Sequence, residues 1–183
     1  SASSCTTCSP GVHASRRRAQ TAERGLDRRP IRRGGVIAAI VSVAPPRSDD
    51  EVAQYEANIR AAAELGAITT HASFTDRRYE EFKAFEEFKI SFEAHQRSVE
   101  RAEPILRRYK MRLAIENHKG WRAAEQAAWI RRMGSEYLGV CYDFGNNFAL
   151  SETPEETFRH LAPLTIYVSF KDMAVEMYDQ GFL

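Results

Sequence analysis

The stretch Arg112-Leu-Ala-Ile-Glu-Asn-His-Lys-Gly120 decides the fold. Its first half is apolar and has the length of a buried strand, whereas its second half carries a carboxylate, an amide, an imidazole and an amine. Ionisable groups are costly in a parallel strand unless they bind a metal, a substrate or one another. We therefore predict a strand over 112–117 with a functional site at its carboxyl end.

Two later stretches repeat this arrangement. Asp143 follows the apolar run Leu138–Tyr142, and Lys171 and Asp172 follow the run Thr165–Phe170. In α/β barrels the carboxyl ends of the strands are where the chemistry takes place. We therefore expect Glu116 and Asp143, one strand-helix unit apart, to lie close together above the sheet.

Strand and helix patterns alternate five times, which predicts an α/β fold of parallel βαβ units with right-handed crossovers. The expected strands are Val36–Val43, Ala67–Phe74, 112–117, Leu138–Tyr142 and Thr165–Phe170. The expected helices run from Asp49 or Asp50 to Gly66, from Asp76 to about Lys110 with a kink or break at Pro104, from Trp121 to Met133, and from a capping box at Thr153 to about Leu161.

Composition excludes several classes of protein. The chain has 183 residues, 43% hydrophobic and 28% charged, which is ordinary for one globular domain. A net charge of +1 makes nucleic acid an unlikely partner, and no apolar run is long enough to cross a membrane. An odd count of three cysteines suits a reducing compartment, so we expect a cytoplasmic location.

The first 35 residues differ from the rest. They hold eight arginines against Glu23 and Asp27 and few large apolar residues, so we predict a disordered leader before a domain at 36–183. A transit peptide or a nucleic-acid-binding arm is the open alternative. Cys5 and Cys8 have CxxC spacing without a second pair, which favours an incidental occurrence over a zinc site.

Two carboxylates at neighbouring strand ends repel each other unless a cation lies between them. We therefore predict that Glu116 and Asp143 bind a divalent ion of the Mg, Mn, Co or Zn class. The alternative is that each carboxylate caps a loop or pairs with a nearby Arg or Lys.

Further candidates surround this pair. His118 could polarise a carbonyl or bind a substrate hydroxyl, or it could be a loop histidine. Lys171 and Asp172 could form a substrate clamp or a simple ion pair. The predicted catalytic residues are Glu116, His118 and Lys171, and the predicted substrate-binding residues are His71, Asn146 and Asp172. His95, on a helical stretch, is expected at the surface.

The motifs Leu-Ala-Ile-Glu-Asn-His-Lys, Gly-Val-Cys-Tyr-Asp-Phe-Gly-Asn and Val-Ser-Phe-Lys-Asp-Met, in this order, resemble the xylose isomerase-like TIM-barrel family over roughly residues 36–183. That family includes sugar phosphate isomerases and epimerases, inosose dehydratases and endonuclease IV. The resemblance implies a partial (β/α)8 barrel of about five units. It also implies a divalent metal held by a Glu, an Asp, a His and a second Glu. Glu116 and Asp143 match the first two ligands, and Ser169 stands where the His is expected.

The resemblance also implies a function. We expect metal-dependent proton transfer next to a carbonyl of a sugar or sugar phosphate, with Glu116 as base. One alternative is a truncated, non-catalytic remnant of the family, because the fourth ligand would come from a later strand. A weaker alternative is an endonuclease IV-like nuclease, which would need further His ligands and a basic surface. The matched strands would be the third to seventh of eight, so the chain resembles a fragment whose open sheet edges could pair in a homo-oligomer.

Overall fold

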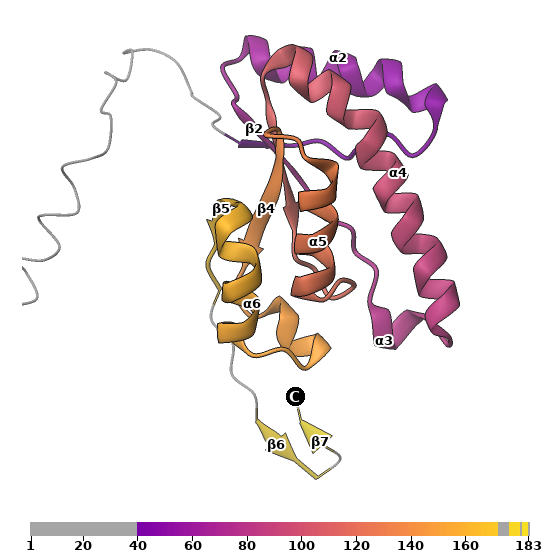
Figure 1. The fold of residues 1–183 in the computed structure, drawn as a ribbon, viewed down its shortest axis with the longest axis vertical. Coiled ribbons are helices and arrows are strands. Elements are labelled where there is room, and N and C mark those ends of the chain that lie inside the picture. The colour runs from indigo at the N-terminus through magenta and orange to yellow at the C-terminus, as the bar shows by residue number, and fades with distance from the viewer. Residues whose placement is uncertain (1–39, 172–175, 180, 183) are drawn as a thin grey trace, which may run out of the picture. The chain divides into compact units, whose positions relative to one another are not determined.

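The computed structural model describes residues 40–171, 176–179 and 181–182. Its main feature is a five-stranded sheet in which all neighbours are parallel and follow the order of the chain (Figure 1). The strands are β1 (Ile40–Ser42), β2 (Thr69–Ala72), β3 (Arg112–Glu116), β4 (Leu138–Asp143) and β5 (Thr165–Ser169). This is the arrangement of a partial TIM barrel, so the predicted fold class is confirmed.

Helices connect the strands. They are η2 (Asp49–Glu51), α2 (Val52–Glu64), α3 (Arg78–Glu81), α4 (Phe85–Tyr109), α5 (Ala123–Met133), η3 (Asn146–Leu150), α6 (Pro154–Leu161) and η4 (Ala162–Leu164). The capping box predicted for α6 is present, since the Thr153 side chain accepts a hydrogen bond from the Glu156 backbone N–H at 3.2 Å.

The long helix predicted from Asp76 to Lys110 is wrong in one respect. The chain leaves the helical conformation between α3 and α4 rather than at Pro104, which lies inside α4. Ala84, at the start of α4, is extended, and the Glu87 carboxylate accepts from the Lys83 backbone N–H at 3.0 Å. Pro104 is exposed, so water can satisfy the carbonyl that its missing N–H leaves free.

Some predictions fall outside the described residues. These are the leader at 1–35, Cys5 and Cys8, the first residues of the strand predicted at Val36–Val43, and Asp172. A short antiparallel hairpin, β6 (Met177–Tyr178) and β7 (Gly181–Phe182), was not predicted. Strands β1 and β5 form the edges of the described sheet, and pairing of copies through these edges stays a prediction.

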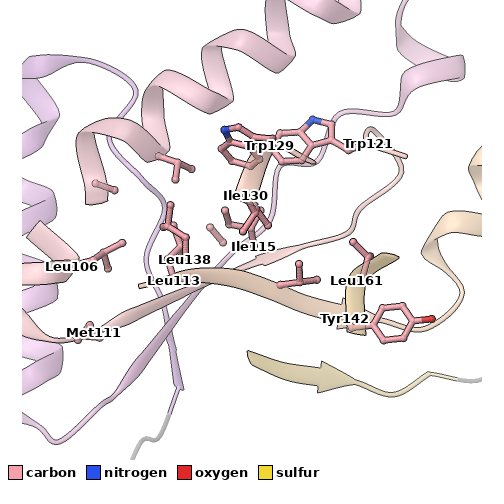
Figure 2. Packing of buried hydrophobic residues seen from close by; sticks show 14 of the residues in the cluster. Leu106, Met111, Leu113, Ile115, Trp121, Trp129, Ile130, Leu138, Tyr142 and Leu161 are labelled. Carbon is pink, nitrogen blue, oxygen red and sulfur yellow. The ribbon is translucent and has the colours of Figure 1, made fainter. Parts of the chain in front are cut away.

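The two faces of the sheet carry different residues. On one face, here called the outer face, Leu113, Ile115 and Val140 are fully buried and belong to one hydrophobic cluster with residues of the helices. Figure 2 shows Leu113 and Ile115 in this cluster together with Trp129 and Ile130 of α5. Because side chains alternate along a strand, the residues between them point to the opposite, inner face.

The inner face carries small and polar residues. Ala114 and Glu116 of β3 lie there, with Gly139, Cys141 and Asp143 of β4. A Cβ atom at Gly139 would lie 2.6 Å from the Leu164 carbonyl oxygen, so this position needs glycine for the close approach of β5. The register pairs Glu116 with Cys141 and Asp143 with Ser169. The polar residues at the carboxyl ends of these strands therefore lie at the same end of the sheet. Within the described residues, no helix has both the length and the apolar character needed to span a bilayer.

Candidate functional site

Glu116 lies at the carboxyl end of β3 on the inner face. Its Oε2 is 3.1 Å from His71 Nε2, and its Oε1 accepts a hydrogen bond from Asn146 Nδ2 at 3.0 Å. The hydrogen bond from His71 lowers the pKa of Glu116 to about 2, against the opposing effect of burial. The carboxylate is therefore ionised at neutral pH.

His71, from β2, reaches across the inner face to Glu116. The Cys141 side chain and then the Glu116 carboxylate raise the pKa of His71 to about 9, so the imidazole is protonated at neutral pH. The ring also lies edge-on to Tyr167 of β5, at 6.1 Å between centroids. The sequence predicted a substrate-binding role for His71; the structure makes it the direct partner of Glu116, and a role with substrate stays a prediction.

Asp143, at the end of β4, has its own cation. Lys171 Nζ lies 3.1 Å from Asp143 Oδ1, in an ion pair without hydrogen-bond geometry. Burial raises the pKa of Asp143, and the Lys171 ammonium opposes that shift. Lys171 also donates to Asn146 Oδ1 at 2.6 Å, so Asn146 joins the Glu116 and Asp143 halves of the site.

A buried amide holds these strand ends in place. Asn117 is fully buried; its Oδ1 accepts from the Asp143 backbone N–H at 2.6 Å, and its Nδ2 donates to the Asp143 carbonyl at 3.0 Å and to Asn147 Oδ1 at 2.7 Å. Asn147 in turn donates to Glu152, which also accepts from the Ala123 backbone N–H at 3.0 Å. Sequence reasoning missed this network, although an Asn directly after the strand-ending Glu116 was its one visible signal.

His118 lies outside the strand, and its catalytic role stays a prediction. Strand β3 ends at Glu116, so His118 lies on the following loop, and its Nδ1 is buried without a hydrogen-bond partner. It is close enough for its charge to help lower the pKa of Glu116, as the weakest of the contributions. His95 was expected at the surface, but it is largely buried and stacks on Phe74 at 4.2 Å.

The site can be tested for its fit to a divalent ion. Each carboxylate already faces a side-chain cation, and among the described residues no group of three or more His, Cys, Asp or Glu could hold a metal. Ser169, in register with Asp143, supplies a weak ligand where the family resemblance implies an imidazole. The described residues therefore do not fit a resident metal as they stand. Asp143 pairs with a lysine, as in the alternative left open above, whereas Glu116 pairs with a histidine, which that alternative did not include.

Comparison with known proteins shows the family. The model of a family described as "Xylose isomerase-like TIM barrel" matches residues 14–181. Because the match spans nearly the whole sequence, the chain belongs to the xylose isomerase-like TIM-barrel family. No curated protein sequence matches the chain.

Solved structures share the fold. The probable 3-DHS dehydratase of Bacillus anthracis involved in petrobactin synthesis is 12% identical with a TM-score of 0.58, and the match covers 74% of this chain and 51% of that one. The 3-keto-D-glucoside 4-epimerase of E. coli is 14% identical with a TM-score of 0.56, and the match covers 71% of this chain and 57% of that one. A xylose isomerase-like TIM barrel protein of Mycobacterium smegmatis, solved in complex with magnesium, is 15% identical with a TM-score of 0.54, and the match covers 79% of this chain and 55% of that one. The chain thus spans about half the length of these proteins, and similarity at this level shows the fold alone.

Proposed function

We propose that this chain carries a proton-transfer site of a sugar isomerase or epimerase, acting on a carbon next to a carbonyl of a sugar or sugar phosphate. The observation that carries the proposal is the Glu116 carboxylate at the end of β3, ionised and held between His71 and Asn146, with the Lys171 ammonium on the other side of Asn146. Membership of the family and the epimerases among its structural neighbours support this reaction class.

The proposed step uses residues of this chain only. Glu116 takes the proton from the carbon, the C–H electron pair forms the C=C bond of an enolate, and the carbonyl oxygen takes up the negative charge. Lys171 and protonated His71 lie close enough to Glu116 and Asn146 to stabilise that charge. Return of the proton to the opposite face of the same carbon gives the epimer. Its return to the former carbonyl carbon, with transfer of the neighbouring hydroxyl proton to the former carbonyl oxygen, gives the isomer.

The low pKa of Glu116 bears on this step. A carboxylate with a pKa near 2 is always ionised but is a weak base. A substrate oxygen that takes over the hydrogen bond from His71 would remove the largest cause of the shift and make Glu116 a stronger base. His71 would then donate its hydrogen bond to the substrate instead of to Glu116. This proposal accounts both for the observed contact of His71 with Glu116 and for its predicted substrate-binding role.

The test is exchange of a sugar C–H with solvent deuterium, followed by NMR. Keto-sugars incubated with the chain in D₂O should lose the proton next to the carbonyl, and Glu116→Gln should reduce the exchange rate by about 10²- to 10⁴-fold. Glu64→Gln serves as control, because Glu64 is exposed at the end of α2 and does not belong to the site or to the buried network. Exchange that survives Glu116→Gln removes Glu116 from the mechanism.

A second candidate is a non-catalytic scaffold. Ser169 at the third ligand position and the two side-chain cations at the carboxylates favour it, because they leave little of the metal site that the resemblance implies. The two candidates differ in one result: a scaffold shows no exchange in the wild-type chain with any keto-sugar or keto-sugar phosphate, with or without added Mn²⁺.

A further inference from the structure

A groove lies between α4 and α5, on the outer face of the sheet. Each of these helices packs mainly against another neighbour, α4 against α2 and α5 against α6, so space is left between the two (Figure 1). The groove has a volume of about 370 Å³. Small-molecule sites in proteins have volumes of about 300–1,000 Å³. None of the described candidate residues lines the groove, so it is separate from the Glu116 site.

Aromatic rings form the apolar part of this groove. Phe88 and Trp129 line it and are 3% and 1% exposed, whereas Phe85 is 57% exposed. Phe92 is partly buried, and its ring centroid lies 6.0 Å from that of Phe88 and 6.4 Å from that of Trp129. Exposed apolar surface beside a hollow of this kind marks a binding site. Because the walls are flat rings, an aromatic ligand can stack against them.

The two carboxylates of the groove already have basic partners. Arg78 donates to both carboxylate oxygens of Glu125, at 2.7 and 3.0 Å. The Arg78 guanidinium also lies 4.5 Å from the centroid of the Phe88 ring, which holds this ion pair in place. Glu93 pairs with Arg97 at 3.9 Å. The negative charges that line the groove are therefore balanced.

The two cations of the groove lack such partners. Lys89 lines it from α4 and Arg132 from α5, and both are exposed. Neither takes part in an ion pair with another residue of the described segments. The groove thus has an excess of positive charge beside its aromatic walls. A carboxylate on the ligand would supply the missing negative charge, and a guanidinium can bind both oxygens of a carboxylate at once.

The same charges argue against a second copy of the chain as the occupant. A two-fold interface at this groove would bring the same surface of each copy together. The positive patch formed by Lys89 and Arg132 would then face its own counterpart, and like charges across an interface repel. A small anion meets no such repulsion.

We propose that the groove between α4 and α5 binds a small aromatic carboxylate. Its ring lies against Phe85, Phe92 and Trp129, and its carboxylate lies between Lys89 and Arg132. The inference does not depend on the proposed function, because no candidate residue of the inner face takes part in it.

The experiment is calorimetric titration of the full chain with 2-naphthoate, 2-naphthamide and decanoate. The amide keeps the rings and lacks the charge, and decanoate keeps the charge and lacks the rings. 2-Naphthoate should bind about tenfold more tightly than either. NMR gives a local readout, because the chain has two tryptophans and Trp129 lines the groove. Its indole N–H signal should shift more on titration than that of Trp121.

Variants test the two parts of the groove separately. Lys89→Met and Arg132→Met should each weaken the binding of 2-naphthoate about two- to fivefold and leave the binding of 2-naphthamide unchanged. Ala128→Leu places a larger side chain in the groove at an exposed position of α5, so it should abolish the binding of both without lowering the Tm. Ala61→Leu, the same change at an exposed position of α2 outside the groove, is the matched control.

Four titration results overturn the proposal. They are no binding of 2-naphthoate, binding of 2-naphthamide as tight as that of 2-naphthoate, tighter binding of decanoate, and binding that Ala128→Leu does not change. Sedimentation velocity of the same samples tests the other occupant. A dimer of the wild-type chain that dissociates in Ala128→Leu would assign the groove to a second copy and would also overturn the proposal.

Discussion

The outer and inner faces of the sheet are made by the same strands but have opposite characters. In β3, Leu113 and Ile115 point to the outer face and are fully buried in the hydrophobic cluster, whereas Ala114 and Glu116 point to the inner face. In β4 the apolar Val140 alternates in the same way with Cys141. The comparison shows that adjacent residues of one strand have different roles. Those on the outer face pack against helices, and those on the inner face carry the paired charges.

The negative charges of the inner face are also balanced by positive charges on the same face. Each of its carboxylates faces a basic side chain, Glu116 with His71 and Asp143 with Lys171, and Asn146 links the two pairs. Partly buried pairs of this kind contribute little net stability, because desolvation offsets most of their attraction. The two faces should therefore respond differently to mutation, metal and pH.

The largest expected effect is on the outer face. Ile115→Ala should lower the free energy of unfolding by about 2–5 kcal/mol, because it leaves a cavity in a fully buried cluster. Cys141→Ala, on the inner face of the neighbouring strand, removes one heavy atom and should cost about 1 kcal/mol. Urea denaturation of the two variants measures both values. Equal losses would show that the inner face contributes as much packing as the outer face.

A smaller effect concerns metal binding at the inner face. Lys171→Met removes the ammonium beside Asp143 and keeps the side-chain length, so it should raise the affinity for Mn²⁺ about tenfold. Calorimetric titration with Mn²⁺ measures it. Lys89→Met on α4, away from the inner face, is the control and should change nothing. If the wild-type chain binds one Mn²⁺ as tightly as the variant does, Lys171 does not compete with the ion.

The smallest effect is the pH dependence of stability from the pair of His71 and Glu116. The Cys141 side chain and then the Glu116 carboxylate raise the pKa of His71 from 6.5 to about 9 on folding, so this contribution is complete below pH 6.5 and is lost as pH rises through 9. The pKa of Glu116 falls from 4.5 to about 2, so its contribution is present above pH 4.5 and is lost as pH falls through 2. The pair therefore stabilises most between pH 4.5 and 6.5.

Because both groups are only half-buried, screening reduces this contribution to about 1 kcal/mol. Urea denaturation measures the free energy of unfolding at pH 5.5 and at pH 9.5. Between these two pH values the wild type should lose about 1 kcal/mol more of it than His71→Gln does. An identical pH dependence in the two proteins would show that the pair adds no stability.

Sequence patterns predicted the fold well because its signals are local. The five strands lie where apolar runs occur, and α6 begins at Thr153 as its capping box requires. The helix predicted over 76–110 was wrong at its break point, because Pro104 is tolerated at an exposed position while the chain turns between α3 and α4. That turn depends on contacts of the segment rather than on a helix-breaking residue.

The site was harder to predict because its contacts join distant positions. Glu116 and Asp143 were found from their places at strand ends, but the two cations at the carboxylates come from β2 and from the end of β5. The role of Asn146 as a bridge leaves no pattern in a single sequence, and the sequence marks the buried Asn117 only by its place directly after Glu116. His95 on α4 lines a cavity together with residues that follow β1 and β2, far from it along the chain.

The amino-acid sequence by itself determined the alternation of strands and helices, the family and the strand ends at which polar groups collect. It did so because periodicity, helix caps and short motifs are encoded by neighbouring residues. Only the tertiary structure decided which cation faces which carboxylate and which buried polar atoms of the described residues have no partner. The physical reason is that pairing and burial depend on distances across the sheet, and these arise when segments far apart in the chain are packed side by side.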